Sequence, residues 1–200
     1  SGQLLISDNN GGRGLDSRLS WAAPTAGTYF VAASSLGNQG RGSYTLRATR
    51  KQDNAPDRLS SGFEYSLIAP GGSLTGDIEV RGDHDWFQTI LQEGKTYSIS
   101  VNAEQSRTGE YDPLRDPALS LRDAAGREIA FDDDSGNGLN TVLIVNPMRT
   151  GRFYLDVHDA TDQYDGCYQI SIKEARDDYG NLISKAFTEH NNEDVTIQGN

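Results

Sequence analysis

The chain has 200 residues, 35% of them hydrophobic, and carries a formal net charge of −11. Nucleic acid and anionic membrane surfaces are themselves negative, so a chain this acidic is unsuited to bind either of them. No run of about 18 apolar residues is present, and we therefore expect no membrane insertion. The single cysteine, Cys167, allows no disulfide within the chain, and 22 glycines are typical of a loop-rich β protein.

Residues 1–50 are predicted to be the C-terminal half of a first repeat. A shift of 124 positions, without a gap, lays residues 129–172 over residues 5–48. The identical pairs include Asp8 and Asp132, Gly12 and Gly136, Gly27 and Gly151, Gly42 and Gly166, and Tyr44 and Tyr168. Self-similarity of this length indicates a repeated domain rather than a short solenoid unit. Within this half, alternating apolar residues predict strands at 27–33 and 42–48.

Residues 51–175 are predicted to form a complete repeat, which opens with a polar linker at 51–57 that contains Pro56. Apolar runs of strand length, separated by turn residues, then follow at 73–80, 86–91, 96–101, 118–121, 128–131, 141–146, 152–157 and 167–172. Helical periodicity is almost absent. Short strands at this spacing predict an all-β fold, an antiparallel β-sandwich or jelly roll.

Residues 176–200 are predicted to start a further repeat, because the same shift of 124 lays Asp177 over Asp53. We therefore expect the chain to belong to a longer protein, with neighbouring repeats as its partners. The two terminal pieces could complement each other within one chain, or between two chains as a strand-swapped dimer. The alternative is that both ends are partly disordered.

Five motifs carry a resemblance to a known family. They are GDHDWF at 82–87, EGKTYSISV at 93–101, DPALSLRDAAGREIAFDDD at 116–134, TGRFYLDV at 150–157 and GCYQISI at 166–172. In this order and spacing the chain resembles the bacterial pre-peptidase C-terminal domain family, over one full copy and half of another. The resemblance implies a non-catalytic β-sandwich appended to a secreted bacterial protein, often a peptidase. It also implies roles in secretion, attachment or calcium-dependent stabilisation, and an extracellular or cell-surface location.

The acidic loop 132–138, with the sequence DDDSGNG, is the best candidate for chemistry. Asp133, Ser135, Asn137 and Gly138 match the opening of a calcium loop, whose ion takes oxygen ligands. The closing Glu is missing, since Ile144 stands at its place, so further ligands must come from other segments. The predicted calcium ligands are Asp132, Asp133, Asp134, Ser135, Asn137, Asp112 and Asp116, with a weaker second site at Asp8, Asn10 and Asp16. For both loops the alternative is a solvated turn whose Asp and Asn side chains cap backbone groups.

The segment around His84 has two interpretations. Asp83 and Asp85 flank this histidine, directly before Trp86 and Phe87. The functional interpretation is a metal or ligand site. The structural interpretation, which we favour, is that one aspartate accepts backbone N–H bonds in a turn while an aromatic side chain enters the core.

The sequence offers little support for an enzyme. It contains neither an H-E-x-x-H zinc helix nor a G-x-S-x-G elbow. His158, with Asp156 and Asp159 beside it, is interpreted as an exposed histidine at a strand end rather than a proton-transfer group. Carboxylates are plentiful, but nothing marks one pair as a catalytic pair. We therefore expect no enzyme in this chain.

These observations predict a non-catalytic accessory module, stabilised by calcium and attached to a secreted peptidase or a large repeat protein. The alternative is an adhesin module that binds a carbohydrate or a matrix protein. Strand phase places Tyr154 and Asp156 opposite Phe153, Leu155 and Val157, on the outer face of the sandwich. A ligand of the adhesin type would bind on that face.

Overall fold

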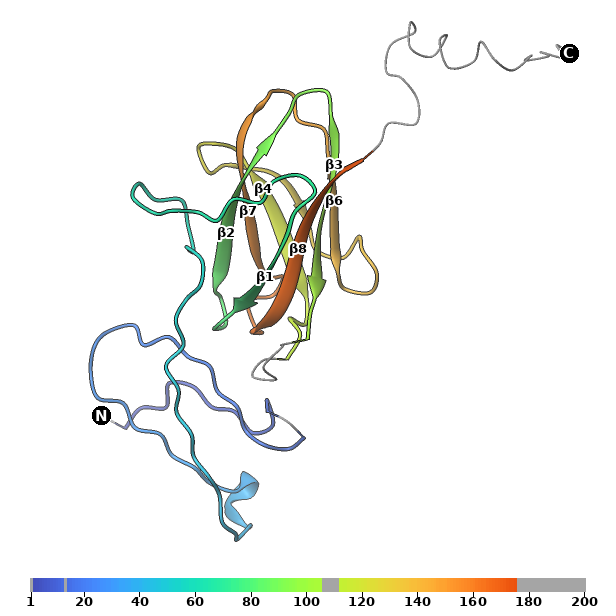
Figure 1. Cartoon of the computed structure of the whole chain (residues 1–200). Helices are drawn as coiled ribbons and strands as arrows, with labels where there is room; N and C mark the ends of the chain where they lie inside the picture. The colour runs from blue at the N-terminus through green and yellow to red at the C-terminus, as the bar shows by residue number, and fades with distance from the viewer. Residues whose placement is uncertain (1, 13, 106–111, 176–200) are drawn as a thin grey trace, which may run out of the picture.

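The computed structural model describes residues 2–12, 14–105 and 112–175 (Figure 1). The segment 176–200, predicted to start a further repeat, lies outside these residues. Eight strands form two antiparallel sheets of four strands each, in the orders β1-β8-β3-β6 and β2-β7-β4-β5. The predicted all-β sandwich is thereby confirmed.

Every strand predicted in residues 51–175 is present, with bounds that differ by at most three residues. The strands are β1 (Ser73–Ile78), β2 (His84–Leu91), β3 (Thr96–Ala103), β4 (Pro117–Arg122), β5 (Glu128–Asp132), β6 (Thr141–Val145), β7 (Gly151–Asp159) and β8 (Gly166–Ala175).

Alternation of apolar and polar residues builds the core between the two sheets. On β3, Tyr97, Ile99 and Val101 are at most 1% exposed, whereas Ser98 and Ser100 between them are half-buried. Successive side chains of a strand point to opposite faces, so an alternating strand buries one complete face. Each large apolar side chain buried in this way stabilises the fold by about 1.5–3 kcal/mol.

The strands predicted at 27–33 and 42–48 are wrong. In residues 2–12 and 14–50 the structure has a short 3₁₀ turn, η1 (Leu36–Asn38), and no strand. Val31 is 69% exposed and Leu46 is 59% exposed, so the alternating apolar residues of this segment have no sheet to cover. A strand needs a neighbour for its backbone N–H and C=O groups, and alternation alone does not supply one.

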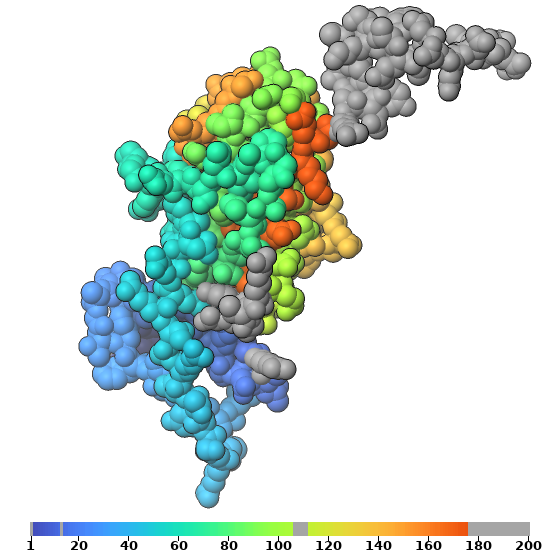
Figure 2. Space-filling model, in the orientation of Figure 1, coloured from blue at the N-terminus to red at the C-terminus, as the bar shows by residue number. Residues whose placement is uncertain are grey.

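Side-chain contacts attach this N-terminal segment to the sandwich. Arg18 Nη2 donates to Asp165 Oδ2 at 2.7 Å, and Ser20 Oγ donates to the same oxygen at 2.9 Å. Asp165 lies in the loop between β7 and β8. Figure 2 shows the N-terminal segment (blue) beside one end of the sandwich, with the linker (cyan) leading from one to the other.

The chain that follows the linker runs along the free edge of β2. The N–H of Gln88 donates to the Ser66 carbonyl at 3.0 Å, and the Gln88 carbonyl accepts the N–H of Ile68 at 2.9 Å. These bonds satisfy backbone groups that an edge strand would otherwise leave open. In the described part of the chain, no helix is both long and apolar enough to cross a membrane.

Candidate functional site

The start of β2 places polar side chains on both faces of its sheet. Asp85 and Phe87 point into the core and are at most 4% exposed, whereas His84 and Trp86 alternate with them and lie on the outer face. Two groups of side chains able to hold a metal ion follow from this alternation. They are an acidic cluster of Asp53, Glu79, Asp83 and Asp85, and a histidine cluster of His84, His158 and Asp162.

The acidic cluster collects carboxylates from three separate segments. Asp53 belongs to the linker, Glu79 follows β1, Asp83 precedes β2, and Asp85 is the second residue of β2. One carboxylate oxygen of each residue lies within 4.8 Å of one oxygen of every other. Glu79, Asp83 and Asp85 are 5%, 8% and 0% exposed. The fold therefore packs three buried acids and one exposed acid around a single point.

Hydrogen bonds hold these acids in place. Asp83 accepts the backbone N–H of Glu79 and that of its own successor in the chain, each at 3.0 Å, and so closes the turn between β1 and β2. The predicted role of one aspartate in stabilising a turn is thus confirmed. Asn54 Nδ2 donates to Glu79 Oε1 at 2.6 Å, and the buried Tyr168 hydroxyl donates to Asp85 Oδ2.

Carboxylates dominate the acidic cluster. No ion pair between described residues reaches these four carboxylates. Two buried oxygens, Glu79 Oε2 and Asp85 Oδ1, have no hydrogen-bond partner among the described residues. Burial, a side-chain interaction with Asp83 and the charges of the nearby carboxylates raise the pKa of Glu79 to about 9. Burial raises the pKa of Asp85 to about 8, against the opposing effect of the Tyr168 hydroxyl.

The arrangement suits calcium. Two oxygens on opposite sides of one Ca²⁺ ion lie about 4.6–5.2 Å apart, which is twice the Ca–O distance. Four oxygens that all lie within 4.8 Å of one another therefore fit around one ion. Carboxylate oxygens are the ligands that hard cations prefer, and the cluster contains neither thiolate nor imidazole. Water would complete the six to eight ligands that calcium takes.

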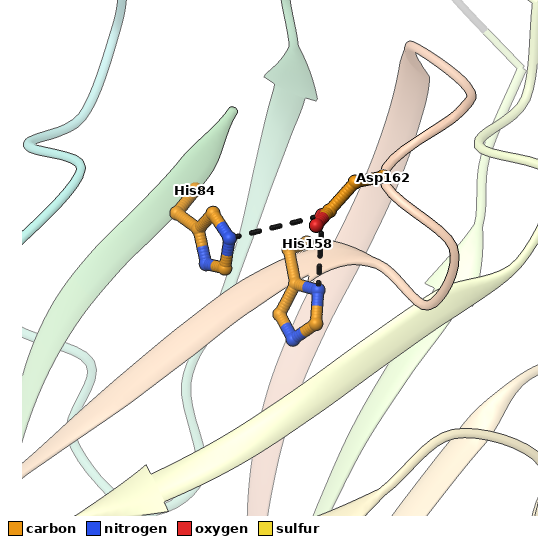
Figure 3. Close-up of side chains that lie close together, drawn as sticks. All are labelled: His84, His158 and Asp162. Atoms are coloured by element: carbon orange, nitrogen blue, oxygen red, sulfur yellow. Dashed lines mark ion pairs between the residues drawn. The ribbon is translucent and has the colours of Figure 1, made fainter. Parts of the chain in front are cut away.

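The histidine cluster lies on the outer face, where β2 and β7 meet (Figure 3). His84 and His158 are directly opposite each other in the ladder, and their rings stack with centroids 4.4 Å apart. Asp162, in the turn after β7, places Oδ1 at 3.8 Å from both His84 Nε2 and His158 Nδ1. Asp156 Oδ1 lies 2.8 Å from His84 Nδ1, and this contact raises the pKa of His84.

The expectation about His158 is corrected by this geometry. Its side chain is 14% exposed, so it is not an exposed histidine at a strand end. Asp156 bonds to His84 on the neighbouring strand, because alternate residues of one strand share a face and the register places His84 opposite His158.

The predicted calcium loop 132–138 connects β5 to β6, and each of its residues is half-buried or exposed. Among the residues that the structure describes, neither metal-binding cluster includes a member of this loop. Asp132 Oδ2 accepts the backbone N–H of Val142 at 2.9 Å and that of Ser135 at 3.4 Å, so this carboxylate holds a turn. Asp134 and Asn137 are exposed.

Asp112 and Asp116, the two calcium ligands predicted outside the loop 132–138, have different surroundings in the structure. Partial burial raises the pKa of Asp116, and the charges of Asp159 and Asp133 raise it further. Asp116 therefore lies close enough to the acidic loop to interact with its charge. Asp112 instead forms an ion pair with Arg18 at 3.7 Å, with its side chain 74% exposed. Calcium in this loop stays a prediction, and the acidic cluster is the better candidate.

The matching loop of the first half has the same hydrogen bonds. Asp8 Oδ2 accepts the backbone N–H groups of Gly11 and Arg18, each at 2.9 Å. Gly11 and Arg18 lie 124 positions before Ser135 and Val142, whose N–H groups donate to Asp132. Asn10 and Asp16, the other predicted ligands, are exposed, and no metal-binding cluster in the described residues includes Asp8 or Asp16.

The prediction that Tyr154 and Asp156 form an exposed ligand face is wrong, because the two residues are 5% and 1% exposed. The loop 59–65 covers this part of β7, and the Tyr65 ring packs edge-on against Tyr154 with centroids 5.1 Å apart. Arg122 Nε donates to Asp156 Oδ2 at 2.9 Å. Strand phase predicted the face correctly, but it carries no information about a loop that folds over it.

Sequence reasoning missed Asp53, Glu79, Tyr168 and Asp162. Each comes from a different segment, so no spacing motif joins them. The one signal was the triplet of Asp83, His84 and Asp85, which belongs to both clusters.

Comparison with known proteins gives distant likenesses. No family model and no curated protein matches the chain. Among solved structures, it is similar to the pre-peptidase C-terminal domain of a collagenase from Bacillus anthracis, with 22% identity, a TM-score of 0.43, and coverage of 57% of this chain and 100% of that chain. It is also similar to PliG, a periplasmic inhibitor of g-type lysozyme from Aeromonas hydrophila, with 10% identity, a TM-score of 0.39, and coverage of 56% and 100%. A third is CorA, a surface-associated copper-binding protein of Methylomicrobium album BG8, with 11% identity, a TM-score of 0.36, and coverage of 55% and 98%. All three TM-scores are low, and the fold described above rests on this chain's own strand pairing.

Proposed function

We propose that this chain is a non-catalytic accessory module of the pre-peptidase C-terminal type, and that calcium bound by the acidic cluster stabilises its fold. The observation that carries the proposal is the pair of buried oxygens, Glu79 Oε2 and Asp85 Oδ1, that lack a hydrogen-bond partner among the described residues. Buried carboxylates cost free energy unless each is neutralised and fully hydrogen-bonded or coordinated. One divalent cation supplies both the charge and the missing contacts.

The position of the cluster supports a role in holding the module together. Asp53 comes from the linker, whereas Glu79 and Asp85 belong to the sandwich, so an ion bound by all three ties the linker to the sandwich. An ion that binds only the folded state stabilises it by about 2.7 kcal/mol at a hundredfold excess over Kd. Calcium modules of extracellular proteins bind with Kd of roughly 0.1–1 mM, which supports a secreted or cell-surface setting.

Thermal unfolding with and without calcium tests the proposal. We expect saturating calcium to raise the Tm of the wild type by about 10 °C, the shift that about 2.7 kcal/mol produces in a domain of this size. Glu79→Gln should abolish that rise, because it removes one charge from the acidic cluster. Asp133→Asn is the matched control, since it removes one charge from the exposed loop, and it should respond to calcium as the wild type does.

Two outcomes would contradict the proposal. A calcium effect that disappears in Asp133→Asn and persists in Glu79→Gln would move the ion to the loop 132–138. A wild-type Tm that calcium leaves unchanged would remove calcium stabilisation altogether.

An open groove supports a second candidate function, the binding of a glycan. The groove has a volume of about 580 Å³ and lies between the loop 59–65 and β7, with Phe63, Tyr65, Gln88 and Arg152 in its lining. Phe63 is 52% exposed and offers an apolar ring, while Gln88 and Arg152 offer hydrogen-bond donors, the combination that small-ligand sites use. A glycan array compares the wild type with Phe63→Ala. We expect the substitution to abolish binding, and equal binding by both proteins would exclude the groove.

A further inference from the structure

The histidine cluster offers imidazole nitrogen atoms, which are not ligands of calcium. Imidazole nitrogen suits zinc, copper and nickel, whereas calcium takes oxygen. We propose that His84, His158 and Asp162 form a second metal site, which takes a divalent transition-metal ion of the zinc and copper class. The proposal stands apart from the calcium function, because none of these three side chains belongs to the acidic cluster.

Three elements bring the ligands together. His84 is the first residue of β2 and lies directly opposite His158, the last but one residue of β7. Asp162 sits in the turn that follows β7, with φ of 56°, and its N–H donates to the Asp159 carbonyl at 3.0 Å. This turn brings the Asp162 carboxylate up to both rings, as Figure 3 shows. The backbone alone therefore fixes which three side chains meet.

The ligand atoms stand close to binding distance. Asp162 Oδ1 is 3.8 Å from a nitrogen of each ring, and all three ligand atoms lie within 4.8 Å of one another. Two ligands on one tetrahedral zinc ion, each about 2.0–2.1 Å from the metal, are about 3.3 Å apart. Asp162 is 55% exposed and free to move by that difference. The rings, whose planes differ by 23°, must tilt toward each other about their Cβ–Cγ bonds.

His84 is oriented for metal binding by a fixed carboxylate. Its Nδ1 lies 2.8 Å from Asp156 Oδ1, and the other oxygen of Asp156 accepts Arg122 Nε–H at 2.9 Å and forms an ion pair with Nη2 at 2.8 Å. Asp156 is 1% exposed, so this partner is immobile. A histidine that donates Nδ1–H to a carboxylate keeps the lone pair of Nε2 available. Here Nε2 is the atom that faces Asp162, which is the carboxylate–histidine–metal arrangement of zinc proteins.

His158 is packed between two rings, with His84 on one side and Phe131 at a centroid distance of 6.3 Å. Its Nδ1 lies 3.0 Å from the Asp159 carbonyl. Metal binding at this nitrogen replaces that contact, because one nitrogen cannot hold a proton and a metal together. Three protein ligands leave a fourth tetrahedral position for water or for a group from another molecule, so the site is of the open type.

Zinc titration of the full chain by calorimetry, in saturating calcium, tests the site. Calcium fills the acidic cluster first, so the heat reports on the histidine cluster. We expect one equivalent of zinc to bind, with affinity weakened at least tenfold in His84→Gln, in His158→Gln and in Asp162→Asn. The third histidine of the sequence supplies the matched control, and His190→Gln should bind zinc as the wild type does.

A second measurement needs no substitution and so does not depend on how the variants fold. Cu²⁺ is added below one equivalent to the calcium-loaded wild type, and the imidazole resonances are followed by NMR. We expect His84 and His158 to broaden before His190. Equal broadening of all three histidines, or zinc affinity that none of the three ligand substitutions changes, would overturn the proposal.

Discussion

Raising the pH of the calcium-free protein from about 5.5 to about 7.5 tests the acidic cluster by a route that involves no metal. In the folded protein the pKa of Glu79 is raised to about 9 and that of Asp85 to about 8. In the unfolded chain both groups ionise near pH 4. Between these values the folded state binds more protons than the unfolded state, so stability falls as the pH rises.

The expected loss is large. Each group that is protonated when folded and ionised when unfolded lowers the free energy of unfolding by about 1.4 kcal/mol per pH unit. Two such groups over two pH units give about 5 kcal/mol, a large part of the roughly 5–15 kcal/mol that holds a domain folded. With a urea m-value of about 2 kcal/mol/M, the midpoint should move down by about 2.5 M.

Urea unfolding at several pH values measures this loss. His84 also has a raised pKa, so the stability it contributes is present at low pH and is lost as the pH rises through that pKa, in the same direction. The comparison with Glu79→Gln/Asp85→Asn isolates the two carboxyls, because that variant should lose much less stability. Calcium should flatten the wild-type curve at the upper end. A calcium-free wild type whose midpoint is constant or rises over this range would refute the electrostatic reasoning.

Three further substitutions test individual contacts. Gly136→Ala places a methyl group against the Asn140 carbonyl oxygen, and we expect a loss of about 1–3 kcal/mol by urea unfolding, with an unchanged midpoint as the contrary result. Tyr168→Phe removes the hydroxyl that donates to Asp85, and should cost about 1–3 kcal/mol in the calcium-loaded protein, which equal stability would contradict. Asp123→Ala should lower the Tm by a few degrees at neutral pH. Hydrogen bonds, chiefly from Arg127, hold the pKa of this carboxyl below its usual range. The difference in Tm from the wild type should therefore vanish only when the pH falls below that lowered pKa. A difference that persists at such a pH would contradict this prediction.

The strands of residues 51–175 were predictable because each is a short apolar or alternating run bounded by turn residues. The β4–β5 hairpin is an example, since Gly126 has φ of 80° and glycine adopts that conformation without strain. The same alternation at 27–33 led to a wrong strand. Tyr29 and Val31 fit the pattern, but no strand of the described residues lies beside them. Periodicity indicates which face a strand would bury, but it does not indicate whether a neighbouring strand is present to pair with it.

A candidate site could be predicted only where its residues lie next to each other in the sequence. Asp83 and His84 drew notice because they are adjacent in sequence. Tyr168 reaches Asp85 because β8 pairs with β1, with Gly76 opposite Tyr168 and no side chain there to block the ring. Asp162 joins the histidines only because of the turn after β7. These contacts depend on sheet register and on turn geometry, which a single sequence does not specify.

The turn held by Asp132 has a consequence for the order in which the sandwich folds. An equivalent turn, held by Asp8, is present in a segment without strands, so the contacts that form it are local. Asp132 Oδ2 reaches the N–H of Val142, only ten residues away, and a loop of that length closes in about 10–100 ns. This turn joins β5 in one sheet to β6 in the other. It can therefore form before either sheet and fix the crossing between them, so Asp132→Ala should slow folding while leaving the unfolding rate almost unchanged.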